Sequence, residues 1–371
     1  MEKAFNNFMA RLQEPQKPWN KQGPEDLSNI SLAKRPRIEY KIPQPGEIIG
    51  GYVLSEKVGQ GSFGIVFEGH AIDSIKKVAI KIEICSDQRY SQLENEYNVY
   101  KKLDGASGFP RIEYFGQCEA YKHLVMEYLG MSLEDMLAIR NRMFCAKTIF
   151  IVAKRMLTLI EKLHSIGYVH RDLKPDNFLI GRDPKKIFLI DLGMAKEFLK
   201  HGQHISTGAG KKLTGTPRYA SVNAHKGYEL SRRDDLESIG YIVLYLSKGR
   251  LPWQGLKESK REKCRIIGEM KDAMKIEEIA RDLPGGTKII EYFKYIDTLR
   301  FDDVPDYKYM TGLFDSALHS HGLIDDGVFE WEHVFKGYTE TVTDDSLDEE
   351  STKKASFWGK VRNFICCNYS K

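Results

Sequence analysis

The hydrophobic pattern changes character along the chain. From Tyr52, apolar and polar residues alternate over the short runs "YVLSEKVG", "GIVFEGHA", "KKVAIKIEI", "RIEYFGQC" and "YKHLVMEYL", which glycine or polar turns separate. Such runs are typical of strands. One stretch with helical character, residues 89–103, lies among them. From Ser132 onward, apolar residues recur at helical spacing, as in "AKTIFIVAKRMLTLIEKLHSIG" and "RDDLESIGYIVLYLSKG".

We therefore predict an α+β chain with two lobes. The smaller, N-terminal lobe contains an antiparallel sheet with one helix and covers about residues 46–129. The larger, mainly helical C-terminal lobe covers about residues 130–338. Residues 1–45 are rich in Gln, Asn, Pro and Lys without sustained periodicity, which predicts a mostly disordered leader. Residues 339–371 form a tail whose first half is acidic and whose second half is basic and aromatic.

Composition indicates a soluble globular protein. Of 371 residues, 42% are hydrophobic and 29% are charged, and the net charge of +4 is too small to indicate a nucleic-acid partner by itself. No apolar run approaches the length of a membrane span, and the polar N-terminus lacks a signal-peptide core, so we expect a cytoplasmic protein. "KRPR" at 34–37 would also fit a nuclear signal, although short basic clusters are common. The first four cysteines are scattered singly, which indicates neither a disulfide framework nor a zinc site.

The segment "VGQGSFGIV" (58–66) places three glycines between two predicted strands. Glycines allow backbone amides to approach phosphate oxygens, although a plain glycine hairpin is an alternative. A dinucleotide site of the Rossmann type is disfavoured because that site needs a helix directly after the turn. In the following "VAIK", Lys81 lies among buried-looking residues and needs an anion. Nucleotide phosphates and a helix carboxylate, Glu96 or alternatively Glu94, would supply it.

Two further segments carry the most specific signal. "HRDLKPDNFLI" (170–180) places Asp172, Lys174 and Asn177 on one loop, and "IDLG" (190–193) adds Asp191 after a short strand. These residues combine a candidate base, a cation and two hard oxygen ligands suited to magnesium. Any one of them could be structural. A structural role does not account for all of them in this order.

This ordered set resembles the eukaryotic protein kinase superfamily from about residue 50 to about residue 335. The resemblance implies ATP and Mg²⁺ as cofactors. It implies that Lys81, oriented by Glu96, holds the phosphates and that Asp172 accepts the proton of the substrate hydroxyl. It also implies that Lys174 steadies the transferred phosphoryl group and that Asn177 and Asp191 bind the metal. The ATP site that it implies consists of Val58, Gly59, Gly61, Gly64, Val66, Ala79, Lys81, Met126, Glu127, Leu129 and Leu179.

The sequence departs from the general kinase pattern at two positions. Leu192 replaces the usual Phe after the metal-binding Asp, and "ASVN" (220–223) stands in place of A-P-E, without its Glu. The second departure narrows the family. The segment "LTGTPRYASVNAHKGYELSRRDDLESIGYIVLYLSKGRLPWQGL", together with "LRFDDVPDYKYMTGLF", "DNFLIG" and "SLEDML", is similar to the casein kinase 1 family. By the same resemblance, Asp235 would anchor the catalytic loop.

Resemblance to casein kinase 1 implies a serine/threonine kinase that prefers acidic or phosphate-primed protein substrates. Such an enzyme needs a cationic pocket, and the matching residues are Arg218, Lys263, Arg171 and Lys196. For Lys263, an ordinary solvated helix face is the alternative. A pseudokinase scaffold is the runner-up function, disfavoured by the presence of Lys81, Asp172, Asn177 and Asp191. A small-molecule or lipid kinase is disfavoured by Lys174.

The tail carries its own candidate chemistry. Cys366 and Cys367 lie beside basic and aromatic residues, a setting that suits reversible S-palmitoylation and attachment to the cytoplasmic face of a membrane. The alternative is an apolar hook that folds back onto the domain. Ser351 follows "DEE" and so resembles a substrate of such a kinase. Its self-phosphorylation could then occupy the Arg218 pocket.

Overall fold

The computed structural model describes residues 42–61, 64–85 and 91–332. These residues all belong to one compact unit, Lys41–Lys371. The predicted leader up to residue 41 and the predicted tail at 339–371, with its Ser351, Cys366 and Cys367, lie outside the described residues. No helix in the described part of the chain is long and apolar enough to span a membrane.

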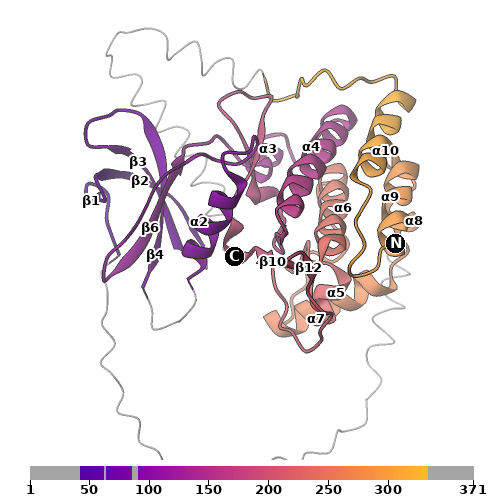
Figure 1. Ribbon diagram of the computed structural model, residues 1–371. Helices are drawn as coiled ribbons and strands as arrows, with labels where there is room; N and C mark the ends of the chain where they lie inside the picture. The colour runs from indigo at the N-terminus through magenta and orange to yellow at the C-terminus, as the bar shows by residue number, and fades with distance from the viewer. Residues whose placement is uncertain (1–41, 62–63, 86–90, 333–371) are drawn as a thin grey trace, which may run out of the picture. The chain divides into compact units, whose positions relative to one another are not determined.

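The N-terminal lobe is built on an antiparallel sheet with one helix, as predicted (Figure 1). Within the described residues the sheet has six strands in the order β1-β2-β3-β4-β6-β5. The strands are β1 (Ile48–Ile49), β2 (Tyr52–Gly61), β3 (Gly64–Ala71), β4 (Lys77–Ile84), β5 (Ile112–Gln117) and β6 (Tyr121–Glu127). The helix α2 spans Gln92–Leu103 and begins there because the Ser91 hydroxyl accepts a hydrogen bond from the Glu94 backbone N–H.

The two faces of this sheet have different chemistry. Ile65, Phe67 and Ile80 alternate with more polar or smaller residues and are buried in a core on one face. Because side chains alternate along a strand, Val66 and Lys81, which pair across β3 and β4, lie on the opposite face. The sequence alternation thus buries one face in apolar core and leaves the other for a polar site.

The C-terminal lobe is mainly helical, as predicted. Its helices are α3 (Leu133–Ile139), α4 (Ala146–Ser165), α5 (Val222–His225), α6 (Arg232–Lys248), α7 (Lys260–Ala273), α8 (Ile276–Ala280), α9 (Gly286–Thr298) and α10 (Tyr307–Ser320). Short strand pairs join β7 (Tyr168–Val169) to β10 (Lys196–Glu197), β8 (Phe178–Ile180) to β9 (Ile187–Leu189), and β11 (Leu199–Lys200) to β12 (Gln203–His204). Two 3-10 helices, η1 (Pro175–Asn177) and η2 (Leu192–Met194), lie between these strands.

Helices α4 and α6 form the centre of this lobe and contact each other, with α10 against α4 and α9 against α6 (Figure 1). Helix α6 begins with a capping box between Ser231 and Asp234 and ends at Gly249, whose φ of +71° favours glycine. The packing continues past α10. The Trp331 side chain is fully buried and its Nε1 donates to the Pro184 carbonyl at 3.0 Å. The helical lobe therefore includes residues up to the end of the described chain.

Candidate active site

Lys81 lies at the centre of the polar face of the sheet. Its Nζ is 2.6 Å from Glu96 Oε2 on α2 and 2.7 Å from Asp191 Oδ1, which directly precedes η2. The ammonium therefore joins the two lobes, since α2 also packs on η2. Only 12% of the Lys81 side chain is exposed, so the two carboxylates supply the partners that a buried cation needs.

The choice between Glu96 and Glu94 is decided by helix geometry. Glu96 faces the sheet and is buried, whereas the Glu94 carboxylate accepts from Lys122 on β6. Asn95, between them, points toward η2, where its Nδ2 donates to the Gly193 carbonyl at 3.1 Å. Helix α2 thus presents a charge to Lys81 and an amide to the segment that follows Asp191.

Burial and opposite charge shape the ionisation of this cluster. Burial opposes the charge of Lys81, but the carboxylates of Asp191 and Glu96 raise its pKa above the ordinary lysine value. Burial also opposes ionisation of Asp191, yet the Lys81 ammonium holds the pKa of Asp191 below its usual value. The lysine is therefore charged and Asp191 is an anion at neutral pH.

The Asp235 carboxylate on α6 binds the backbone of the loop 170–177. Its Oδ2 accepts from the His170 backbone N–H at 2.7 Å, and its Oδ1 accepts from the Arg171 N–H at 2.9 Å. The Asp235 carboxylate also accepts from His164 on α4 at 2.9 Å. Arg171 adopts a φ of +70°, and the two hydrogen bonds to Asp235 stabilise this sharp turn. The anchoring role expected for Asp235 thus agrees with its contacts.

Asp172 lies where this loop meets the segment after η2. Its Oδ2 accepts from Lys174 Nζ at 2.9 Å. Its Oδ1 accepts from both the Thr216 backbone N–H, at 2.7 Å, and the Thr216 hydroxyl, at 2.8 Å. The preceding Gly215 has a φ of +87°, and a Cβ there would lie 2.4 Å from the Arg171 carbonyl oxygen. A glycine is therefore required for Thr216 to reach Asp172.

Asn177 and Asp191, the two residues expected to bind a metal, come from neighbouring segments. The Ile190 backbone N–H donates to the Asn177 carbonyl at 2.9 Å, which places Asn177 next to Asp191. Asn177 Nδ2 donates to the Asp172 carbonyl, so its amide oxygen lies on the other side. No cluster of three or more His, Cys, Asp or Glu side chains that could hold a metal occurs among the described residues. A carboxylate and an amide fit a magnesium-like ion that takes its other oxygens from phosphates and water.

The glycine turn and the apolar residues expected at the adenine lie on the strands around Lys81 and on the segments next to them. Gly64 has a φ of +136°, and a Cβ there would lie 2.3 Å from the Ile82 carbonyl oxygen. At Gly59 and Gly61, by contrast, an added Cβ would have no described atom within 4 Å, which leaves open space over the sheet. The apolar residues expected at the adenine are placed by the strand pairing Ala79–Met126, by buried Leu129, and by half-buried Val58, Val66 and Leu179.

Comparison with known protein families identifies this arrangement. A family model for the protein kinase domain matches residues 52–300. The chain belongs to the protein kinase family. This membership establishes a kinase that uses ATP and a divalent metal and transfers phosphate to proteins. The predicted fold class is confirmed, and the segment from Asp191 to about Asn223 is the activation segment of the kinase.

Hydrogen bonds to α6 and α7 hold the end of the activation segment, where the A-P-E sequence is absent. The Ser221 hydroxyl and the Asn223 amide both donate to Asp234 Oδ1 on α6, at 2.8 and 3.0 Å. Lys271 on α7 is 5% exposed, and its Nζ donates to the carbonyls of Pro217 and Ala220 at 3.0 and 2.5 Å. Burial lowers the pKa of Lys271. Hydrogen bonds from a serine, an asparagine and a buried lysine thus hold this segment, which lacks the Glu of A-P-E.

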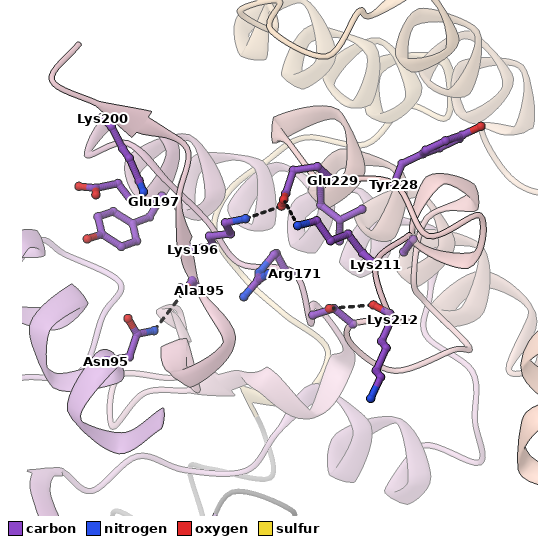
Figure 2. Close-up of a pocket in the computed structure, with 14 residues that line it drawn as sticks. Asn95, Arg171, Ala195, Lys196, Glu197, Lys200, Lys211, Lys212, Tyr228 and Glu229 are labelled. Carbon is purple, nitrogen blue, oxygen red and sulfur yellow. Dashed lines mark hydrogen bonds and ion pairs between the residues drawn. The ribbon is translucent and has the colours of Figure 1, made fainter. Parts of the chain in front are cut away.

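A basic pocket lies between the activation segment and the catalytic loop (Figure 2). Its volume is about 600 Å³. The residues that line it are Asn95, Tyr168, Arg171, Ala195, Lys196, Glu197, Lys200, Lys211, Lys212, Thr214, Ala224, Tyr228, Glu229 and Leu230. Arg171 Nε donates to the Met194 carbonyl at 2.8 Å. The pocket therefore carries an excess of positive charge beside Asp172 and the catalytic loop.

Two of the four residues expected at the substrate phosphate line this pocket. Arg171 and Lys196 line the basic pocket, but Arg218 and Lys263 do not. The Arg218 guanidinium lies 5.6 Å from the Tyr245 ring centre and 5.7 Å from that of Tyr219. Lys263 is half-buried on α7.

Several residues of the site were not found from the sequence. Thr216 donates to Asp172, and Lys271 donates to the carbonyls of the activation segment, but neither residue belongs to a motif that indicates such a contact. Lys211 and Lys212 line the basic pocket, and Glu229 is bonded to Lys211 and Lys196. The adjacent lysines before "LTGT" were the available signal, since they lie in the segment that already contained Arg218.

Proposed function

We propose that this chain is a serine/threonine protein kinase of the casein kinase 1 type. It transfers the γ-phosphoryl group of ATP to Ser or Thr in acidic or phosphate-primed proteins. The single observation that carries the proposal is the basic pocket lined by Lys196, Lys211 and Arg171, the residue directly before Asp172. The Ser221–Asn223 replacement for A-P-E, bonded to Asp234, supports the same subfamily.

The residues of the centre divide the proposed reaction among them. Asp172 accepts the proton of the attacking hydroxyl. Its carboxylate, which lies between Lys174 and Thr216, is the group on the catalytic loop that can act as a base. Lys81, fixed by Glu96, holds the phosphates, and Lys174 neutralises charge on the transferred group. Asn177 and Asp191 would hold Mg²⁺, which supplies charge neutralisation at the phosphate oxygens when bound.

The basic pocket suits a phosphate dianion better than a neutral side chain. A guanidinium offers paired donors and lysines offer point charges, and both bind phosphate oxygens through charge-assisted hydrogen bonds. An acidic residue would use the same donors with less charge. We place the upstream anion of the substrate here. Phosphate reading by Arg218 and Lys263 stays a prediction for a second, separate anion contact.

The test is a radiolabelled ATP assay on two peptides that differ only in a phosphoserine three residues before the acceptor. We expect the phosphorylated peptide to have the higher kcat/KM and the label to appear on Ser or Thr. Lys196→Ala should reduce this preference, whereas Lys185→Ala on the exposed β8–β9 turn should not. Arg218→Ala is the parallel arm for the second contact. Equal rates on both peptides with the unaltered enzyme would refute the priming proposal.

We further propose reversible attachment of this cytoplasmic kinase to a membrane through palmitoylation of Cys366 or Cys367. The support is the sequence alone, in which paired cysteines adjoin basic and aromatic residues. Metabolic labelling with a palmitate analogue tests it. Label that disappears in Cys366→Ser/Cys367→Ser supports attachment, and the absence of any cysteine-dependent label refutes it.

A further inference from the structure

Glu229 places a carboxylate among the lysines of the basic pocket. Its Oε1 lies 2.6 Å from Lys196 Nζ, and its Oε2 lies 3.5 Å from Lys211 Nζ. Figure 2 shows both lysines reaching the same carboxylate from opposite sides. The Glu229 side chain is 9% exposed, whereas those of Lys196 and Lys211 are 33% and 53% exposed. The carboxylate thus forms part of the pocket wall, and the lysines extend toward solvent.

The backbone holds this carboxylate at a fixed place, just after α5 and the end of the activation segment. The Glu229 N–H donates to the Gly208 carbonyl at 2.8 Å, and the Lys211 N–H donates to the Gly227 carbonyl at 2.9 Å. Residues 208–211 of the activation segment are therefore hydrogen-bonded to residues 227–229, which follow α5. The side-chain pair with Lys196 then connects both stretches to β10.

This connection leads to the catalytic loop by two short paths. Lys196 lies two residues after Met194, whose carbonyl accepts from Arg171 of the loop. On the other side, Lys211 lies five residues before Thr216, which donates twice to Asp172. Glu229 therefore fixes the two parts of the activation segment that contact the loop. Movement of either part would alter the surroundings of Asp172.

The Glu229 carboxylate neutralises part of the positive charge of the basic pocket. Arg171, Lys196 and Lys211 would repel one another across the pocket without an anion between them. In kinases generally, a phosphate on the activation segment supplies that anion through new pairs with basic residues. Here Glu229 already forms ion pairs with two of these cations, Lys196 and Lys211. An isolated surface ion pair contributes little, but a buried carboxylate shared by two lysines of different segments restrains both.

We propose that Glu229 is a positioning residue that serves as the resident counter-anion of the basic pocket. It orders the activation segment when no phosphate is bound, so that the kinase acts on unprimed substrates without phosphorylation of its own loop. A bound phosphate takes over this role. The inference rests on the proposed function only in requiring that the pocket admits phosphate.

The test compares Glu229→Gln with the unaltered full chain on an unprimed acidic peptide. We expect kcat to fall about 10-fold while the KM for ATP stays unchanged, because only segment order is lost. Added inorganic phosphate should then restore much of the rate in Glu229→Gln, with sodium chloride at equal ionic strength as the control. The unaltered enzyme should gain nothing from phosphate. A phosphopeptide substrate should likewise narrow the difference between the two enzymes.

A matched variant and a second substitution keep the test decisive. Glu113→Gln alters a carboxylate on β5, outside the pocket, that is likewise shared by two cations, Lys76 at 2.6 Å and Arg111 at 3.0 Å, and should leave the unprimed rate unchanged. Glu229→Asp keeps the charge with a shorter reach and should lose less than Glu229→Gln. It serves as the reporter if Glu229→Gln does not fold.

Two results would overturn the inference. One is a Glu229→Gln enzyme with the full unprimed rate. The other is a folded enzyme whose lost rate does not respond to phosphate. Failure of the proposed function looks different, since it appears in the unaltered enzyme as equal rates on primed and unprimed peptides.

Discussion

Two lysine clusters in this kinase have opposite charge balance. At the centre, the single ammonium of Lys81 meets two carboxylates, Glu96 and Asp191, at 2.6 and 2.7 Å. In the basic pocket, Lys196 and Lys211 share the single carboxylate of Glu229. The Lys81 side chain is 12% exposed, while those of the pocket lysines are 33% and 53% exposed.

The difference teaches which ligand each cluster can take. An excess of negative charge around Lys81, with the Asn177 amide nearby, favours a divalent cation and the phosphates that accompany it. An excess of positive charge in the pocket favours an anion. Both clusters contain lysine–carboxylate pairs, so it is their charge balance and burial, rather than the presence of ion pairs, that separates their functions.

The largest effect is expected from the buried cluster. Lys81→Met should reduce kcat by about 100-fold or more, because a preorganised charge at the phosphates is lost. The matched control is Lys77→Met on the same strand, whose 51%-exposed ammonium pairs with Glu68 at 2.8 Å. Steady-state phosphorylation of a protein substrate measures both. Comparable losses in the two variants would show that the burial of the Lys81 cluster has no special function.

The pocket should give a smaller and more selective effect. The double variant Lys196→Ala/Lys211→Ala should lower kcat/KM for a phosphoserine-containing peptide about 10-fold to 100-fold, since charge-assisted bonds to phosphate are lost. The unphosphorylated peptide should lose less. Peptide kinetics at fixed ATP provide the measurement. An equal loss on both peptides would contradict the assignment of the pocket to the substrate anion.

A third lysine sharpens the comparison, because its hydrogen-bond partners are carbonyls. Lys271→Met removes two hydrogen bonds to Pro217 and Ala220 and should lower the free energy of unfolding by about 2 kcal/mol. It should also raise the KM for peptide. Lys226→Met is the control, since its pair with Asp272 on α7 is exposed. Denaturant unfolding decides the point, and unchanged or increased stability would show that α7 does not anchor the segment through this lysine.

The smallest effect is expected from salt. Raising ionic strength from about 0.1 M toward about 1 M shortens the Debye length from roughly 10 Å to roughly 3 Å, which screens exposed charges more than buried ones. The preference for the phosphoserine peptide should therefore decline while the KM for ATP changes less. Parallel titrations of the two constants measure this. A KM for ATP that responds more strongly than the peptide preference would reverse the comparison.

The centre could be predicted from the sequence because its chemistry lies in short motifs. The motifs "VAIK", "HRDLKPDN" and "IDLG" identify Lys81, Asp172, Asn177 and Asp191. The helix that follows "VAIK" contains Glu96, with Glu94 as the alternative partner of Lys81. The structure pairs Glu96 with Lys81 and turns Glu94 toward Lys122. The change from strand-like to helix-like patterns near residue 130 also predicted the two-lobed fold.

The pocket could not be predicted in the same way, because its residues come from separate segments. Lys196, Lys211 and Glu229 lie far apart in the sequence and meet only after the activation segment has folded. The ring contacts of the Arg218 guanidinium with Tyr219 and Tyr245 were likewise not predicted. Such contacts depend on loop conformation, for which residue spacing gives no guide.

The most direct test of the account is phosphate transfer to a peptide pair, with and without an upstream phosphoserine, measured for the unaltered kinase and for Lys196→Ala/Lys211→Ala. The account predicts label on Ser or Thr, a clear advantage for the phosphoserine peptide, and loss of that advantage in the double variant. An advantage that survives in the double variant would contradict the pocket, and no advantage in the unaltered kinase would contradict the proposed substrate class.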